Sequence, residues 1–200
     1  FQGKNRTDSF LDVLALDEQR AIAIGAYGLF ATTMDGGATW TTRRIREEDF
    51  HLNRISAGPS GTLYIAGEAG TLLRSTDKGA TWLPIPSAYQ GSFFGVLPLG
   101  ARVLLAYGLR GHVFRSEDDG ASWQEITGAP PVLVASALPL PDKRIFLAGQ
   151  ARHLLVSTDE GRTLSAASSA PTTAIAELVD LGEGRVLALG EAGATALKLP

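Results

Sequence analysis

An internal repeat of about 41 residues is the feature that most constrains this chain. An eight-residue motif begins at Thr33, returns at Ser75 and Ser116, and has a degraded fourth copy at Ser157. A glycine stands eight residues before each start, at Gly25, Gly67, Gly108 and Gly149, and Gly190 continues the series into a fifth unit. Repeats of this kind cannot bury their apolar faces alone, so the units must stack against one another.

Each unit reads as short strands joined by turns. In the second unit we expect strands over 52–57, 62–66, 71–75 and 81–85, which are rich in β-branched and aromatic residues and separated by glycine-containing turns. No stretch long enough to form a helix has apolar residues at the 3.6-residue spacing of a helix face. Four short antiparallel strands every ~41 residues are typical of a propeller blade. The sequence therefore predicts an all-β β-propeller over 10–200, with four-stranded antiparallel blades at about 10–45, 51–86, 93–126, 133–166 and 174–199.

The fifth unit stops where its fourth strand should begin. Lys198 replaces the motif serine, and residues 4–9 are a poor strand for completing the blade. The chain is either a five-bladed ring with an incomplete last blade or part of a larger propeller, and we favour the second. Residues 1–9 are set aside as an N-terminal segment, because Phe1-Gln2-Gly3 looks like the remnant of a cleavable tag. No signal peptide is expected in this sequence.

Composition excludes several classes of function. The chain has no cysteine, which excludes disulfides, thiolate nucleophiles and Cys-ligated metal sites. A net charge of −3 argues against a nucleic-acid partner. No apolar run reaches the ~18 residues of a membrane-spanning helix, so no direct membrane insertion is expected.

The repeated motif resembles the Asp-box, or BNR repeat, of sialidases and related propellers. Its aspartate can accept hydrogen bonds from its own turn, its glycine can adopt a conformation that a Cβ resists, and its tryptophan can bury a large area between blades. A Ca²⁺ or ligand loop is the alternative, but each copy regularly supplies only one carboxylate. We therefore predict structural clamps and no metal, with these members: Asp35, Gly37, Trp40, Asp77, Gly79, Trp82, Asp118, Gly120, Trp123, Asp159 and Gly161.

The four expected strands of each unit are labelled A, B, C and D in chain order. Candidate binding residues gather on the end of each blade that carries the turn between strands B and C and the connection into strand A, here called the loop face. Loops on a rigid scaffold usually carry function, and aromatic and arginine side chains most often anchor interfaces. The candidates are Tyr27, Phe50, His51, Glu68, Tyr89, Phe94, Arg110 and Arg152. Arg152 occupies a repeat position at which the other units have glycine. Phe93 is expected in the core, and His112 and His153 share a column that we interpret as solvated rather than metal-binding.

A sialidase-like glycoside hydrolase is the main enzymatic alternative. Sialidase chemistry needs arginines that bind the substrate carboxylate and a tyrosine nucleophile paired with a glutamate. Residues of these types are present at Arg54, Arg110, Arg152, Tyr27, Tyr107 and Glu68. The family's Phe/Tyr-Arg-Ile-Pro motif is missing, and Asn53-Arg54-Ile55-Ser56 is only a faint echo of it. No dinucleotide or phosphate loop is found either. We predict no catalytic residues and no cofactor, with a glycan-binding or small-molecule-binding propeller as further alternatives.

The units together resemble the photosystem II stability/assembly factor family of Asp-box propellers, in the branch found in non-photosynthetic bacteria. The resemblance rests on stretches such as Ala23–Phe30, Phe50–Asn53, Leu63–Gly70, Gly91–Gly95 and Leu104–Gly111. It implies a non-enzymatic, periplasmic or otherwise extracytoplasmic scaffold of about seven blades. The implied partner is a membrane protein or an RND-type transporter complex. A photosystem role is not supported, because the family's arginine-rich surface is only partly visible.

Overall fold

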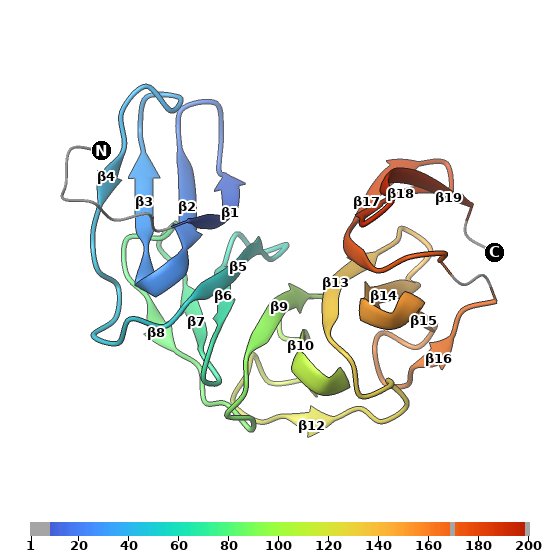
Figure 1. Cartoon of the computed structure of the whole chain (residues 1–200). Coiled ribbons are helices and arrows are strands. Elements are labelled where there is room, and N and C mark those ends of the chain that lie inside the picture. The colour runs from blue at the N-terminus through green and yellow to red at the C-terminus, as the bar shows by residue number, and fades with distance from the viewer. Residues whose placement is uncertain (1–8, 169–170, 199–200) are drawn as a thin grey trace. The chain divides into compact units, whose positions relative to one another are not determined.

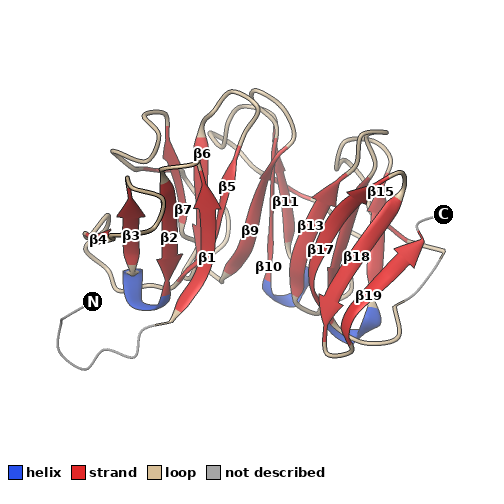
Figure 2. Ribbon diagram, turned by 90° about the horizontal axis from the view of Figure 1, so that it is seen from above, coloured by secondary structure: helices blue, strands red, loops and turns tan. Residues whose placement is uncertain are grey.

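The repeats fold into short antiparallel strands wherever their apolar columns recur (Figures 1 and 2). The structure is a computed structural model that describes residues 9–168 and 171–198. The tag-like first residues and most of the poor strand expected at 4–9 lie outside this range. The chain divides into two compact units, the first ending at Ala101 and the second beginning at Arg102, and each is described by itself.

Unit 1 holds the first two repeats and the first strand of the third. The two complete sheets are four-stranded and antiparallel, in the order of the chain. The elements are β1 (Phe10–Ala15), β2 (Ala21–Gly25), the 3₁₀ turn η1 (Ala26–Gly28), β3 (Phe30–Thr33), β4 (Thr41–Thr42), β5 (Leu52–Ala57), β6 (Leu63–Gly67), β7 (Leu72–Ser75), β8 (Leu83–Pro84) and β9 (Phe93–Pro98).

Unit 2 continues the series with the rest of the third repeat and the fourth and fifth repeats. Its elements are β10 (Leu104–Gly108), η2 (Leu109–Gly111), β11 (Val113–Ser116), β12 (Gln124–Glu125), β13 (Val134–Pro139), β14 (Ile145–Gly149), η3 (Gln150–Arg152), β15 (Leu154–Ser157), β16 (Ser165–Ala166), β17 (Ile175–Gly182), β18 (Arg185–Gly190) and β19 (Gly193–Lys198). The sheet β17–β18–β19 has three strands among the described residues, as the sequence predicts.

The all-β propeller fold with antiparallel blades is confirmed, and the strand bounds differ in one instructive way. The expected fourth strand over 81–85 is only the two-residue β8 (Leu83–Pro84). Thr81 is held by the preceding turn, because its N–H and hydroxyl both bond to Asp77. The ladder with β7 therefore begins only at Leu83, which pairs with Arg74.

The first glycine of each B–C turn is required by space rather than by a left-handed backbone. Gly25 and Gly108 are extended, with φ of −176° and −175°. A Cβ on Gly67 would lie 2.3 Å from the backbone oxygen of His51, and one on Gly149 would lie 1.9 Å from that of Leu133. The start of the blade's own first strand passes directly over these glycines. Positive φ occurs at the last glycine of the turn, as at Gly70 with φ 71°.

Side chains of the first strands bridge successive repeats within each unit. The first strands β1, β5, β13 and β17 each carry a bulge near their start, for example between Leu52 and Arg54. In unit 1, Asp12 Oδ2 of β1 accepts the backbone N–H of Ile55 in β5 at 2.9 Å. In unit 2, Ser136 Oγ of β13 accepts that of Leu178 in β17 at 3.1 Å. The bridge therefore recurs at the same repeat position although the residue type changes.

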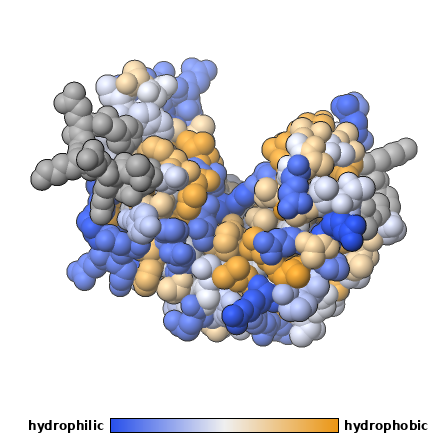
Figure 3. All heavy atoms as spheres, in the orientation of Figure 1, coloured by the Kyte–Doolittle hydropathy of each residue, from blue (hydrophilic) through white to orange (hydrophobic). Residues whose placement is uncertain are grey.

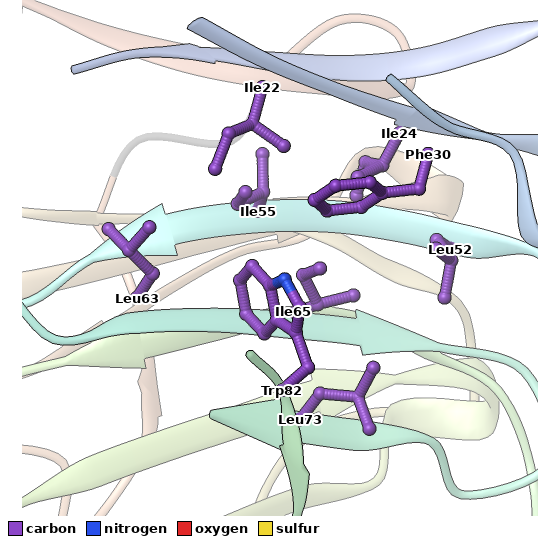
Figure 4. Packing of buried hydrophobic residues seen from close by; sticks show 9 residues of the cluster. All are labelled: Ile22, Ile24, Phe30, Leu52, Ile55, Leu63, Ile65, Leu73 and Trp82. Atoms are coloured by element: carbon purple, nitrogen blue, oxygen red, sulfur yellow. The ribbon is translucent and has the colours of Figure 1, made fainter. Parts of the chain in front are cut away.

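Apolar layers lie between successive repeats. In unit 1, Ile22, Ile24 and Phe30 of the first repeat pack against residues of the second repeat, as Figure 4 shows. The second repeat contributes Leu52, Ile55, Leu63, Ile65, Leu73 and Trp82. A corresponding layer in unit 2 joins Phe146 and Ala148 to Val186 and Ala188. Each repeat thus has a forward face and a back face, and neither is buried without a neighbour.

Candidate functional site

The four Asp-box turns are closed by their own hydrogen bonds. In the second repeat, Ser75 Oγ donates to Asp77 Oδ1 at 2.7 Å and accepts the N–H of Gly79 at 2.8 Å. Thr81 donates its N–H to Asp77 Oδ1 at 2.9 Å and its hydroxyl to Oδ2 at 2.6 Å. The same four bonds recur around Asp35, Asp118 and Asp159. Both oxygens of each carboxylate are therefore engaged by donors of the turn itself.

These bonds set the charge state of the four aspartates. The hydroxyl of the Thr or Ser four residues on, assisted by that residue's backbone N–H, lowers the pKa of Asp35, Asp77, Asp118 and Asp159 from 3.8 to about 2. The glycines that follow, Gly37, Gly79, Gly120 and Gly161, all have positive φ, between 81° and 91°. Within the described residues, no group of three His, Asp or Glu side chains is arranged to hold a metal ion.

The motif tryptophans differ in burial. Trp82 is 9% exposed and meets the ring of Phe30 edge-on at 6.0 Å, within the layer between the first two repeats. Trp40 and Trp123 are half-buried, and Leu164 replaces the tryptophan in the fourth repeat and is buried. Arg43 adds a second tie between the first two repeats, because its guanidinium lies over Phe30 and donates to the backbone oxygen of Gly79 at 2.5 Å.

The loop face of a repeat is held together by one recurring backbone bond. The residue that follows the first glycine of the B–C turn donates its N–H to the residue before strand A, as Glu68 does to His51 at 3.0 Å. The same bond joins Ala26 to Ser9, Gln150 to Leu133 and Glu191 to Ala174. The B–C turn and the entry into strand A therefore lie together in each of these repeats, as the predicted loop face requires.

Large side chains stand at the tips of these turns in the left-handed backbone region. Tyr27 has φ 53° and Arg110 has φ 57°, in the position that Ala69 and Ala151 occupy in other repeats. The next position is glycine in three of these turns, but in the fourth repeat Arg152 occupies it with φ 59°. A side chain with a Cβ is strained in this region, whereas glycine is not.

In unit 1, the structure brings three of the predicted site residues into contact. The rings of Tyr27 and His51 meet edge-on, with centroids 4.8 Å apart. Glu68 Oε2 accepts the backbone N–H of His51 at 2.8 Å, and its Oε1 lies 3.5 Å from His51 Nδ1. Tyr27 itself is 55% exposed. An exposed aromatic ring is thus placed beside a fixed imidazole and carboxylate that come from the next repeat.

A contact that sequence reasoning missed lies beside this group. Arg46 places its guanidinium 5.4 Å from the ring centroid of Phe50 and donates to the hydroxyl of the buried Thr71 at 2.6 Å. It also pairs with Glu48 at 3.0 Å. Phe50 is half-buried in consequence. The only sequence signal was the clustering of arginines and acids between the first and second repeats, which does not say which pair forms.

The other aromatic candidates are partly in the core. Phe93 is buried, as expected, and Tyr89 meets it edge-on at 5.6 Å between ring centroids. Tyr89 and Phe94 are both half-buried. The segment is tied to the preceding turn, because Gly70 donates its N–H to the oxygen of Gly91 at 2.7 Å.

In unit 2, Arg110 and Arg152 are exposed at the tips of η2 and η3, and neither forms an ion pair with another described residue. The two histidines of the shared column behave differently. His112 Nδ1 lies 2.5 Å from Glu125 Oε1, whereas His153 is exposed. Tyr107, one of the two tyrosines considered for sialidase chemistry, is only 2% exposed, so a sugar cannot reach it.

None of the helical segments among the described residues is long and apolar enough to cross a membrane.

Sequence comparison identifies relatives among assembly factors. The family model for the photosynthesis system II assembly factor YCF48 matches residues 4–131. The chain is also 38% identical over 76 residues to the photosystem II assembly lipoprotein Ycf48 of Synechococcus sp. (strain CC9902). That alignment covers 36% of this chain and 22% of the relative's length.

Solved structures with similar folds come from several functional classes. YCF48 bound to D1 peptide has a TM-score of 0.70 at 19% identity, covering 97% of this chain and 68% of that one. YCF48 from Cyanidioschyzon merolae has a TM-score of 0.73 at 16% identity, covering 99% and 69%. The Niastella koreensis GH74 enzyme has a TM-score of 0.73 at 20% identity, covering 96% and 29%. Identities this low establish the fold alone. The family match over more than half of the chain establishes the relationship, and the chain belongs to the photosynthesis system II assembly factor YCF48 family.

Proposed function

We propose that the chain is a non-catalytic binding and assembly scaffold of the bacterial cell envelope, which binds a membrane protein through the loop face of its repeats. Family membership supports the scaffold role. A relative of the same fold is described as bound to D1 peptide, and another is named an assembly lipoprotein. By analogy the partner is an extracytoplasmic segment of a membrane protein. The proposal includes an RND-type transporter complex as its first candidate, from the bacterial branch that the chain resembles.

The observation that carries the proposal is the composition of the strained turn tips. Tyr27 and Arg110 occupy left-handed positions where other repeats have the small residues Ala69 and Ala151, and Arg152 does so where glycine stands in other repeats. Strain of this kind persists where the surrounding structure enforces it, and it often marks sites of function. Tyrosine and arginine are also the side chains that most often dominate binding energy.

Site-specific crosslinking in cells tests which surface is engaged. We would introduce p-benzoylphenylalanine at Tyr27, which is 55% exposed at the loop face, and at Met34, which is 70% exposed at the opposite end of β3. The expected result is a crosslink to a membrane protein from position 27 and none from position 34. Mass spectrometry of the crosslinked band identifies the partner.

Charge reversal then tests the arginines. Arg110→Glu should weaken recovery of the crosslinked partner at least about tenfold, which is the scale of one lost interface anchor. Arg185→Glu is the matched control, because Arg185 is exposed beside Glu183 in the turn between β17 and β18, away from the loop face. Equal crosslinking from positions 27 and 34, or equal losses in the two charge variants, would reject the loop face as the binding surface.

A glycoside hydrolase is the second candidate, because a GH74 enzyme shares the fold. It predicts turnover of fluorogenic glycosides that is lost in Glu68→Ala and Arg110→Ala. Turnover that survives both substitutions would point to a contaminant, and turnover that both abolish would replace the scaffold proposal.

A further inference from the structure

The carboxylate of Glu68, on the loop face of unit 1, is held in place without a basic partner. Its Oε2 accepts the backbone N–H of His51 at 2.8 Å, and the backbone N–H of Glu68 donates to the oxygen of His51 at 3.0 Å. The side chain is 37% exposed, and Oε1 lies 3.5 Å from His51 Nδ1. Among the residues that the structure describes, Glu68 has no ion pair with a lysine or an arginine. It therefore presents an oriented and accessible negative charge.

The chain around Glu68 carries an excess of acidic side chains. The connection over 44–51 and the turn over 68–70 together hold four acidic side chains and two arginines. Each arginine is already paired within the connection, Arg44 with Asp49 at 2.6 Å and Arg46 with Glu48 at 3.0 Å. Figure 3 shows hydrophilic side chains over this connection, which leads from β4 into β5. The two local arginines therefore do not neutralise Glu68.

An exposed aromatic ring stands beside this charge. Tyr27 of the first repeat is 55% exposed, and its ring meets that of His51 edge-on with centroids 4.8 Å apart. The face of an aromatic ring attracts a cation, and a carboxylate forms its strongest hydrogen bonds with charged donors. An acidic side chain would be repelled by Glu68, and an apolar one would desolvate the carboxylate without replacing its lost hydrogen bonds. The combination therefore favours a cation.

The fold does not require these three side chains. In unit 2, the equivalent positions of the third and fourth repeats hold Arg110, Leu133 and Gln150. The backbone bond between the last two is nevertheless the same, because Gln150 donates its N–H to the oxygen of Leu133 at 3.0 Å. The junction of a B–C turn with the next strand A therefore forms without an aromatic ring or a carboxylate, and its side chains are free to serve binding.

We propose that Tyr27, His51 and Glu68 form a contact site for a cationic side chain, an arginine or a lysine, of the protein partner. The inference rests on the proposed function, since it names the chemistry that the partner offers to the loop face of unit 1. The cation lies against the Tyr27 ring and donates to Glu68. His51 is a positioning residue, because its backbone N–H orients the carboxylate and its ring fixes that of Tyr27.

The test is an NMR titration of the full chain with two small probes, Nα-acetyl-arginine methylamide and the matching citrulline derivative. Citrulline has nearly the same shape as arginine but no charge. The arginine probe should shift the backbone amides of His51 and Glu68, and the citrulline probe should bind about fivefold more weakly, which is the scale of an accessible ion pair. Equal binding of the two probes, or no shift of these amides by the arginine probe, would overturn the proposal.

Two variants locate the contact. Glu68→Gln keeps an acceptor for the His51 N–H and removes the charge, so it should weaken binding of the arginine probe about fivefold. Tyr27→Ala should weaken it about threefold by removing the ring. Glu18→Gln is the matched control, because it removes one exposed carboxylate from the turn between β1 and β2, at the opposite end of the sheet.

The outcomes separate this inference from the function on which it rests. If Glu68→Gln disturbs the rest of the spectrum, Tyr27→Ala carries the test. Undiminished binding in the folded variants, or an equal loss in Glu18→Gln, rejects the contact site. A partner that still crosslinks from position 27 would then leave the loop face as a binding surface with different chemistry. Charge-dependent binding of the arginine probe without any crosslinked partner would instead retain the site and remove the proposed membrane-protein scaffold.

Discussion

At the scale of single residues, the B–C turns show a conflict between local backbone preference and side-chain choice. The left-handed region costs a residue with a Cβ roughly 1–2 kcal/mol relative to the right-handed one. Tyr27, Arg110 and Arg152 nevertheless occupy it, while other repeats use glycine or alanine in the same turn. The fold can accept glycine at the position of Arg152, since Gly28, Gly70 and Gly111 show that geometry with φ between 71° and 74°.

Arg152→Gly should therefore leave the protein as stable as before or stabilise it by up to about 1 kcal/mol. Relief of the left-handed strain opposes the greater chain entropy that glycine brings to the unfolded state, about 0.4–1 kcal/mol. Urea denaturation measures the free energy of unfolding. A loss of more than about 1 kcal/mol would mean that the Arg152 side chain supports the fold.

Gly111→Ala is the matched opposite. Its Cβ would lie 2.0 Å from the backbone oxygen of Pro130, and its φ of 74° is unfavourable for alanine. A destabilisation of about 1–3 kcal/mol is expected in the same assay. Equal effects of the two substitutions would contradict the distinction drawn between these two turns.

At the scale of elements, the first strands act as bridges between successive repeats. Ser136 is fully buried, accepts the N–H of Leu178 and donates to Glu177 Oε1 at 2.8 Å. This link joins β13 to β17 by polar contacts at the position where the Asp12–Ile55 bond joins β1 to β5. A repeat interface is therefore fastened by hydrogen bonds as well as by apolar packing.

Ser136→Ala should destabilise the protein by about 1–3 kcal/mol, because it leaves a buried N–H without its acceptor. Hydrogen exchange gives the specific readout: the amide of Leu178 should exchange faster, with little change at amides of β15. Ser165→Ala is the control, since Ser165 is exposed. Unchanged protection at Leu178 would show that another group accepts the bond.

Trp82 tests the apolar part of the same kind of interface. Trp82→Ala should cost about 3–5 kcal/mol by leaving a cavity beside Phe30. Trp82→Phe should retain most of the stability, because the indole Nε1 is buried with no hydrogen-bond partner among the described residues. Denaturation of both variants measures the difference. A phenylalanine variant as unstable as the alanine variant would indicate an undetected partner for that nitrogen.

At the scale of the whole molecule, features that repeat were predictable from sequence and single contacts were not. The glycine and Asp-box columns predicted the strands and turns, because each position was sampled several times along the chain. Tyr27, His51 and Glu68 were all predicted as candidates, but their mutual contact depends on how one repeat sits on the next within unit 1. The hydrogen bond from Arg46 to Thr71 was not predicted for the same reason, because no repeated sequence position links these two segments.

The four Asp-boxes together should determine how the molecule responds to acid. The hydroxyl bonds from Thr39, Thr81, Ser122 and Thr163 lower the pKa of the four aspartates from 3.8 to about 2. The unfolded chain therefore binds protons at a higher pH than the folded one. The stability that each aspartate contributes is complete above its ordinary pKa, and it is lost as the pH falls from about 4 to about 2.

Urea denaturation at a series of pH values should show a nearly constant free energy of unfolding above about pH 5 and a steep fall below about pH 4, with a slope that reports the protons taken up on unfolding. Asp77→Asn should lower the stability at neutral pH and make the acid slope shallower by up to one proton. Asp49→Asn, which removes only a half-exposed ion pair with Arg44, should leave the slope near that of the wild type. If the wild type and Asp77→Asn lost stability in parallel, the Asp-box bonds would not be what lowers these pKa values, and the turns would be held by packing alone.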